Sequence, residues 1–370
     1  MSTKKDNFTI KDKQFMQIAL NLALAREGLT GTNPSVGCVI VKDNKIISIG
    51  QTSHDGRPHA ERNAINDSIE NVAGSKMYVT LEPCCHKGKT PPCTNLIIKS
   101  KISEVIYSIS DIDKRVSGKS FKVLKSSKIK VAKNLLKKDI SRFYYPYFFN
   151  RKNKIPFVIG KIAVSKNNLI YSKEKQKITN IYSDKFSHFL RYKNDTILIS
   201  YKTLNKDDPK LNCRLKNKNN FSPIRVILDS KLNSNPNTYL IKSASKIKTI
   251  IFYNKATKSK ILLFNSKKVL LIKSKINKNK EFKLKEILKK LYSLGSRNLL
   301  VEGGDKLTKS FINDKIFNKF YLFKSSNNLS KNTEFVEFNS LNTLKSKYRY
   351  KSKLNLKLKK DKIELYKNYV

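Results

Sequence analysis

The sequence predicts two α/β domains joined near residue 150, and three observations support this. A length of 370 residues is typical of two or three domains. Short β-rich runs alternate with helical patterns along most of the chain. An aromatic cluster at residues 143–149 precedes a polar segment at 150–154, which indicates the packed end of one domain and a linker. We therefore place the domains at residues 1–149 and 150–370.

In the first domain, the spacing of apolar residues predicts the individual elements. Apolar side chains recur at helical spacing from Lys11 until Gly28, where glycine ends the pattern. Asp43 and Asn44 separate two β-rich runs and predict a hairpin. A second helix follows Pro58, with Ile65 and Ile69 expected to face inward. In total we expect helices over residues 11–28, 59–71 and 91–99, and strands over 36–41, 45–49, 77–81 and 105–109.

The second domain repeats this alternation. We expect strands over residues 157–164, 196–200, 225–229, 249–253 and 299–301, and helices over 179–192 and 284–294. After Asn327 the sequence is rich in Lys, Asn and Ser, and its hydrophobic pattern is too weak to predict elements.

The formal net charge of +49 permits binding to polyanions. The excess, however, is lysine spread from Lys4 to Lys367, accompanied by many Asn and Ile residues, only 12 Gly and no Trp. Lys, Asn and Ile share A/T-rich codons, so compositional drift with lysines on solvated faces is the favoured interpretation. A nucleic-acid surface remains the alternative.

The segments that would direct the chain to a membrane or an oxidising compartment are not visible in the sequence. No run of about 18 apolar residues exists, and no apolar signal-peptide core follows the polar first residues. Three of the five cysteines (Cys84, Cys85 and Cys93) lie within ten residues, which favours a metal site over disulfides. We expect a cytoplasmic protein that does not bind membranes.

Four residues form the pattern of a catalytic zinc site. His59, Cys84 and Cys93 would supply one imidazole and two thiolates, a three-ligand set that leaves the fourth position open for water. Glu61 is too close to His59 to be a good fourth ligand on a helix, yet near enough to transfer protons to and from that water. This order of residues is typical of zinc deaminases. The first domain is therefore predicted to be a zinc hydrolase that replaces an exocyclic amino group with oxygen on a pyrimidine-like ring.

Two longer segments carry a more specific resemblance. Residues 80–93 read TLEPCCHKGKTPPC, with eight residues between the paired cysteines, and Asn33-Pro34-Ser35-Val36-Gly37 lies upstream. With these segments the chain resembles, over nearly its whole length, the bifunctional deaminase/reductase of riboflavin biosynthesis, the RibD family. Nucleic-acid deaminases have two residues between these cysteines, which argues against a base deaminase acting on tRNA.

The resemblance implies a fold and an activity for each domain. The first would be a cytidine-deaminase-like three-layer α/β/α domain that deaminates 2,5-diamino-6-(ribosylamino)-4(3H)-pyrimidinone 5′-phosphate. The second would be a dihydrofolate-reductase-like α/β domain, an oxidoreductase that reduces the ribosyl chain to ribityl with NADPH. Relatives form dimers or tetramers, so a homo-oligomer is expected.

The resemblance also assigns roles by position. It places the zinc ligands on His59, Cys84 and Cys93, the proton donor on Glu61, and the pyrimidine contacts of the deaminase on Asn33, His86 and Lys89. In the reductase it places substrate contacts on Arg191, Leu211, Arg214 and Glu302, and NADPH contacts on Ala163, Thr203, Asp207, Ser230 and Gly304. Gly303-Gly304 between a strand and a helix would let backbone N–H groups approach a phosphate.

The sequence departs from the family at several positions. Asn167-Asn168 stands where relatives have Asp-Gly, Lys177 replaces a Trp, Asn180 replaces a Gly, and Thr52 stands where many relatives have a His. Besides the bifunctional enzyme, two hypotheses therefore remain open. One is a deaminase whose reductase half has decayed, and the other is the tRNA base deaminase.

Overall fold

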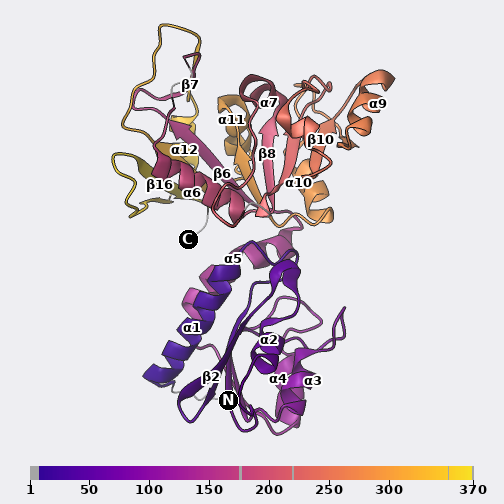
Figure 1. The fold of residues 1–370 in the computed structure, drawn as a ribbon, viewed down its shortest axis with the longest axis vertical. Helices are drawn as coiled ribbons and strands as arrows, with labels where there is room; N and C mark the ends of the chain where they lie inside the picture. Colours follow the sequence, from indigo (N-terminus) through magenta and orange to yellow (C-terminus); the bar gives the residue numbers. More distant parts are fainter. Residues whose placement is uncertain (1–7, 175–176, 219–220, 349, 369–370) are drawn as a thin grey trace. The chain divides into compact units, whose positions relative to one another are not determined.

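The computed structural model describes residues 8–174, 177–218, 221–348 and 350–368. The chain divides into two compact units, Met1–Asn153 and Lys154–Val370, which Figure 1 colours from indigo to magenta and from magenta to yellow. The polar segment at residues 150–154 was expected to be a linker, but helix α5 (Lys137–Asn153) continues through most of it, and Asn150 is buried.

The first unit is a five-stranded sheet between helices. The strand order is β2-β1-β3-β4-β5; β1 pairs antiparallel with β2 and β3, whereas β3, β4 and β5 are parallel. Figure 1 shows α1 and α5 on one face and α2, α3 and α4 on the other. The strands are β1 (Gly37–Lys42), β2 (Lys45–Gln51), β3 (Lys76–Leu81), β4 (Glu104–Ile109) and β5 (Lys130–Lys133). Besides α5, the helices are α1 (Ile10–Arg26), α2 (Ala60–Asn66), α3 (Cys93–Lys99) and α4 (Lys119–Ser126).

The predicted elements of this unit are all present, with one error in the second helix. Helix α2 ends at Asn66, with Asp67 as its C-cap, rather than at residue 71. Ile69, expected to face inward, is 94% exposed because it lies beyond the end of the helix. The hairpin turn is as expected, since Asp43 and Asn44 both have positive φ.

Two glycines let helices pack directly on the sheet. A Cβ at Gly37 of β1 would lie 1.9 Å from the Ala19 carbonyl oxygen of α1. A Cβ at Gly50 of β2 would lie 2.2 Å from the Ala60 carbonyl oxygen of α2. Such distances exclude any side chain, so these glycines set how closely the helices approach. Helix α2 follows His59 and carries Glu61, and its close packing fixes both against the sheet.

The second unit is built on a nine-stranded sheet of order β11-β10-β9-β8-β12-β6-β13-β16-β15. The strands from β11 to β13 are parallel, and β16 and β15 add antiparallel pairs at one end. They are β6 (Phe157–Val164), β8 (Thr196–Ser200), β9 (Ile224–Leu228), β10 (Thr249–Tyr253), β11 (Leu270–Lys273), β12 (Asn298–Glu302), β13 (Lys319–Lys324), β15 (Tyr350–Lys353) and β16 (Lys362–Lys367), with β7 (Leu169–Ser172) and β14 (Phe335–Glu337) forming a separate pair.

The helices of this unit are α6 (Ile181–Tyr192), α7 (Tyr201–Asp207), α8 (Tyr239–Lys242), α9 (Lys258–Ser266), α10 (Leu284–Ser293), α11 (Asp305–Asn313) and α12 (Leu341–Lys347). Every predicted strand and helix is present within a few residues. The region after Asn327, which was left without elements, contains β16, whose Ile363, Leu365 and Tyr366 are buried where it pairs with β13.

The order of strands decides where a ligand can bind. Strand β12 returns late in the chain and inserts between β6 and β8, so the carboxyl ends of these three parallel strands lie side by side. In open parallel sheets, ligands bind at the carboxyl ends of strands where the chain changes direction. Across the described residues, no helix is both long and apolar enough to cross a membrane.

Candidate active sites

Three potential metal ligands converge in the first unit. His59 is the N-cap of α2, Cys84 follows β3, and Cys93 is the first residue of α3. His59 Nδ1 lies 3.6 Å from Cys84 Sγ and 3.5 Å from Cys93 Sγ, and the three ligand atoms lie within 4.8 Å of one another. Tetrahedral zinc with Zn–S of about 2.3 Å and Zn–N of about 2.0 Å requires an S···N separation of roughly 3.5 Å. The distances from His59 to both sulfurs therefore match those of a zinc site.

The pKa values of the two cysteine thiols shift in opposite directions. A hydrogen bond from Cys93 lowers the pKa of Cys84 to about 4 against the effect of burial, and His59 contributes. The same contact with Cys84, together with burial, raises the pKa of Cys93. The Cys93 backbone N–H also donates to Cys84 Sγ at 3.3 Å. Two thiolates this close need a cation beside them, which agrees with a metal site.

Glu61 occupies the first turn of α2 and is only 3% exposed. Burial raises the pKa of its carboxyl group, and the nearby His59 opposes this. Glu61 lines the same cavity as His59 and Cys84, so its carboxyl faces the space beside the metal ligands.

That cavity has a volume of about 310 Å³ and also contains the three predicted pyrimidine contacts, Asn33, His86 and Lys89. Asn33 Nδ2 donates to the Gly56 carbonyl at 2.9 Å, which fixes the orientation of its amide. His86 Nδ1 is buried and has no hydrogen-bond partner in the described part of the chain. Lys89 is exposed. The cavity is thus lined by a fixed amide, a histidine with a free ring nitrogen and an exposed cation.

Two other residues in the motifs serve the fold. Glu82 accepts hydrogen bonds from the backbone N–H groups of Gly118 (3.1 Å) and Ser120 (3.3 Å) and so holds the start of α4. Thr52, where many relatives have a histidine, accepts a hydrogen bond from the Val36 N–H at 2.9 Å and is buried.

Sequence reasoning missed part of the cavity wall: Arg57, Asp111, Asp113, Arg115, Tyr147 and Arg151 also line it. Asp111 is the second residue after the carboxyl end of β4, which is parallel to β3, so strand ends alone could have indicated it. Burial raises the pKa of Asp111, which accepts a hydrogen bond from the Tyr147 hydroxyl at 3.2 Å.

The second unit contains a buried cluster of charges. Glu302 on β12 lies opposite Lys161 on β6, with 3.9 Å between Lys161 Nζ and Glu302 Oε2. Arg191 of α6 donates from Nε and Nη2 to the two carboxylate oxygens of Glu302, both at 2.9 Å. Burial acts to raise the pKa of Glu302, but Arg191 and Lys161 outweigh it and hold the pKa at about 2. Burial lowers the pKa of Lys161.

Arg191 and Glu302 were predicted from the sequence as substrate contacts, whereas Lys161 was not. Its position in the otherwise apolar strand FVIGKIAV could have indicated it, because a lysine is seldom buried unless it is paired with an acidic group.

The loop with Leu211 and Arg214 lies beside this cluster. Arg191 Nη1 donates to the Asn212 carbonyl at 3.4 Å, and the Arg214 backbone N–H contacts His188 Nδ1 at 3.2 Å. The Arg214 side chain is exposed. The Leu211 side chain is buried in the hydrophobic core, so only its backbone is available to a ligand.

The five predicted NADPH contacts come from neighbouring strand ends and the helix after β8. Ala163 is near the end of β6, Ser230 follows β9, and Gly304 follows β12. Thr203 and Asp207 lie on α7, which follows β8 directly. Gly304 is the N-cap of α11, and a Cβ built on it would meet nothing within 4 Å. The backbone is therefore open to a phosphate at the start of this nine-residue helix.

The departures from the family have local explanations. Asn168 has φ +63°, the left-handed conformation that glycine would otherwise supply and that Asn tolerates. Asn167 accepts a hydrogen bond from the Leu329 N–H and donates to the Leu329 carbonyl. Asn180 caps α6 by accepting from the Tyr182 and Ser183 N–H groups. Lys177 forms an ion pair with Asp184.

The fold and the two sites define a two-domain enzyme, a deaminase joined to a reductase. Residues 9–109 match the family model of the cytidine and deoxycytidylate deaminase zinc-binding region, and residues 160–347 match that of the RibD C-terminal domain. The chain belongs to the RibD family of bifunctional riboflavin biosynthesis enzymes.

Individual relatives agree with this assignment. The chain is 34% identical to the riboflavin biosynthesis protein RibD of Aquifex aeolicus, covering 84% of this chain and 86% of that protein. It is 33% identical to RibD of Buchnera aphidicola, covering 89% and 91%. A crystal structure of a diaminohydroxyphosphoribosylaminopyrimidine deaminase/5-amino-6-(5-phosphoribosylamino)uracil reductase from Thermotoga maritima superposes with a TM-score of 0.81 at 27% identity, covering 96% of this chain and 98% of that chain.

Proposed function

We propose that the first unit deaminates 2,5-diamino-6-(ribosylamino)-4(3H)-pyrimidinone 5′-phosphate, with His59, Cys84 and Cys93 as zinc ligands. The observation that carries this proposal is the convergence of the three ligand atoms at a cavity that His59, Cys84 and the buried Glu61 line. The name of the Thermotoga maritima relative supports the choice of substrate.

The reaction adds water to the ring carbon that bears the amino group and releases ammonia. Zinc, when bound, supplies the acidity that makes water a nucleophile near neutral pH. Glu61 accepts a proton from the attacking water and delivers protons to the ring nitrogen and the leaving amino group. Asn33 holds an edge of the pyrimidine ring through its amide, and His86 and Lys89 contact polar or phosphate groups of the substrate.

The test is Glu61→Gln, which preserves shape but cannot transfer protons. Release of ammonia should fall on the order of 10²- to 10⁴-fold, while zinc content and NADPH-dependent reduction of supplied deaminated substrate stay normal. Glu70→Gln, a change at an exposed residue outside the cavity, is the control. Deamination by Glu61→Gln at close to the wild-type rate would exclude Glu61 as the proton carrier.

For the second unit we propose NADPH-dependent reduction of the ribosyl chain to give 5-amino-6-(ribitylamino)uracil 5′-phosphate. Ala163, Thr203, Asp207, Ser230 and Gly304 would hold the cofactor, which supplies hydride when bound. Arg214 would bind the substrate phosphate, and Glu302 holds Arg191 in a fixed orientation beside the loop of Leu211 and Arg214. Lys161 adds a buried amine within the same cluster.

Replacement of Arg214 tests this assignment. Arg214→Ala should raise the KM for the deaminated substrate sharply and change the KM for NADPH little, because a guanidinium–phosphate contact is charge-assisted. Lys216→Ala, an exposed neighbour, is the control. Equal losses for both ligands would show that Arg214 is not on the substrate side. If the wild-type protein oxidises no NADPH with substrate present, the reductase half has decayed.

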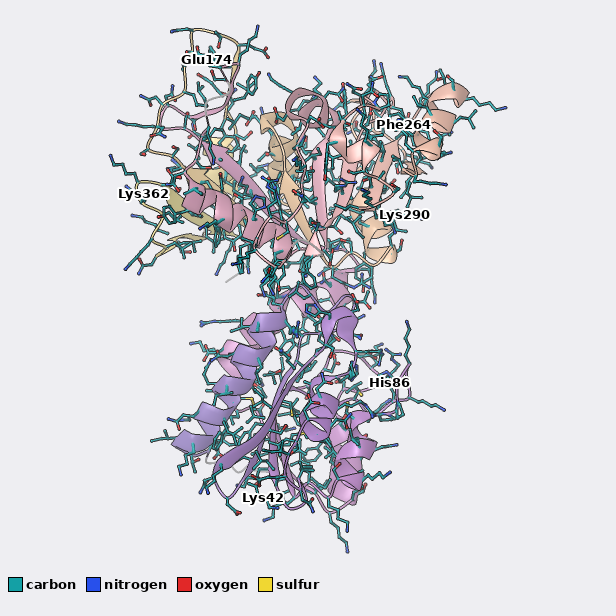
Figure 2. All side chains as sticks on the ribbon, in the orientation of Figure 1. Lys42, His86, Glu174, Phe264, Lys290 and Lys362 are labelled. Atoms are coloured by element: carbon teal, nitrogen blue, oxygen red, sulfur yellow. The ribbon has the colours of Figure 1, made fainter. Side chains whose placement is uncertain are left out.

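We further propose a cytoplasmic homo-oligomer, a dimer or tetramer, that does not use nucleic acid as substrate. Figure 2 shows lysines such as Lys42, Lys290 and Lys362 projecting from different elements. Light scattering measures the assembly. Specific tRNA binding at physiological salt would instead favour the base deaminase.

A further inference from the structure

The cavity of the first unit has more cations than its zinc chemistry uses. Four basic side chains line it: Arg57, Lys89, Arg115 and Arg151. Two of them are engaged within the protein. Arg115 forms a bidentate pair with Asp113, with contacts of 2.6 to 3.2 Å. Arg151 donates to the Thr32 carbonyl and lies over the Tyr147 ring.

Arg57 differs from these two. It forms no ion pair with any acidic group of the described chain, and its only hydrogen bond there is from Nη1 to the neutral Thr90 hydroxyl at 2.6 Å. That bond holds the guanidinium in place without cancelling its charge. Of the four acidic groups that line the cavity, Glu82 caps α4, Asp113 pairs with Arg115, Asp111 accepts from Tyr147, and Glu61 is buried beside His59.

The loop from His86 to Thr90 brings further nitrogen donors close to the Arg57 guanidinium. A Cβ built on Gly88 would lie 3.6 Å from Arg57 Nη2 and 3.9 Å from His86 Nε2, so both nitrogens lie beside Gly88, an exposed residue at the rim of the cavity. Lys89 is the next residue, lines the same cavity and forms no ion pair among the described residues. A planar guanidinium and an imidazole nitrogen beside Gly88, with a lysine as the next residue along the same cavity wall, suit a doubly charged phosphate.

We infer that Arg57 is the phosphate-selecting residue of the deaminase, and that with His86 and Lys89 it binds the 5′-phosphomonoester of the substrate. This inference rests on the proposed deaminase function, because the cavity must hold the pyrimidine for its phosphate to reach this rim. It explains how the deaminase would discriminate the phosphorylated substrate from the same compound without phosphate.

The experiment compares deamination of the phosphorylated substrate with that of its phosphatase-treated form, using the zinc-loaded full chain. Arg57→Gln should raise the KM for the phosphorylated substrate roughly 10- to 100-fold, the effect of a lost charged hydrogen bond, and leave kcat close to the wild-type value. The KM for the dephosphorylated substrate should not change. Arg57→Lys, which keeps the charge, should restore part of the selectivity.

Arg142→Gln is the matched control, because it removes the same charge from an exposed position outside the cavity. It should leave both KM values unchanged. Zinc content and the melting temperature establish that Arg57→Gln is folded. A fall in kcat with unchanged selectivity would overturn the inference and make Arg57 a residue that supports His59.

A second measurement does not depend on turnover. Calorimetric titration with ribose 5-phosphate should show weaker binding to Arg57→Gln than to the wild type or Arg142→Gln, because the reductase unit contributes equally to all three. Equal binding by all three proteins would overturn the phosphate assignment. Absence of deamination by the wild type would instead refute the proposed function, and the titration would still decide whether Arg57 binds phosphate.

Discussion

The change Glu302→Gln tests the buried charge cluster of the second unit. The wild-type carboxylate accepts two hydrogen bonds from Arg191 and faces Lys161 across paired strands. The three side chains are only 13% to 14% exposed. A glutamine has nearly the same shape but is neutral, so two buried cations would face each other without an anion between them. Because the shape is preserved, the loss of stability measures the missing charge.

Two estimates of the magnitude agree. Removing one partner of a buried ion pair costs about 3–5 kcal/mol. The pKa of Glu302 is about 2 against an ordinary 4.5, which corresponds to roughly 3 kcal/mol at neutral pH. Because the folded-state pKa is lowered, this contribution is complete above pH 4.5 and disappears as the pH falls to about 2. The variant should therefore differ most from the wild type near pH 7 and least near pH 2.

Scanning calorimetry of the full chain is the assay, with zinc chelation used to identify the transition of the first unit. In a domain of this size, 3 kcal/mol lowers Tm by roughly 6–12 °C. Only the transition of the second unit should move. Glu337→Gln removes a more exposed ion pair with Lys331 and should cost less than about 1 kcal/mol. A Glu302→Gln transition within 2 °C of the wild type at pH 7 would refute the reasoning.

Three further changes probe the first unit. The wild type should carry about one zinc per chain and Cys93→Ala should lose tight binding; full occupancy in mass spectrometry would exclude this ligand set. Gly37→Ala should cost about 1–3 kcal/mol or more, since its Cβ would overlap the Ala19 carbonyl of α1; an unchanged melting temperature of the first unit would contradict this. Glu82→Gln should cost roughly 1 kcal/mol by weakening the bonds to α4, without loss of zinc; zinc loss would show that Glu82 supports the metal site directly.

The sequence predicted best what depends on residues close together in the chain. The hairpin at Asp43 and Asn44 follows from turn chemistry, and the zinc ligands lie in two short motifs whose order is diagnostic. The position of Glu61 could also be predicted, because Glu61 lies only two residues after the zinc ligand His59, in the first turn of α2.

The sequence predicted least where lysine obscures the hydrophobic pattern or where pairing is distant. In β16 the buried Ile363 and Leu365 alternate with polar residues, but the strand is short and flanked by lysines, and its partner β13 lies some forty residues earlier. Helix α4 was missed for a related reason, because its N-terminus is held by Glu82, which lies far away in the sequence.

The positive charge of the chain explains why Arg57 and Lys161 escaped detection. Among 77 lysines and arginines, composition cannot distinguish the cations that bind a ligand from those that are solvated. A field from scattered surface charges speeds the encounter with any phosphorylated molecule and is screened by salt, so it provides little selectivity. Selectivity requires a cation that is held in place and kept from full neutralisation. The Thr90 hydroxyl does this for Arg57. Fixed cations of this kind, and not the net charge of +49, should determine which phosphorylated compounds the enzyme accepts.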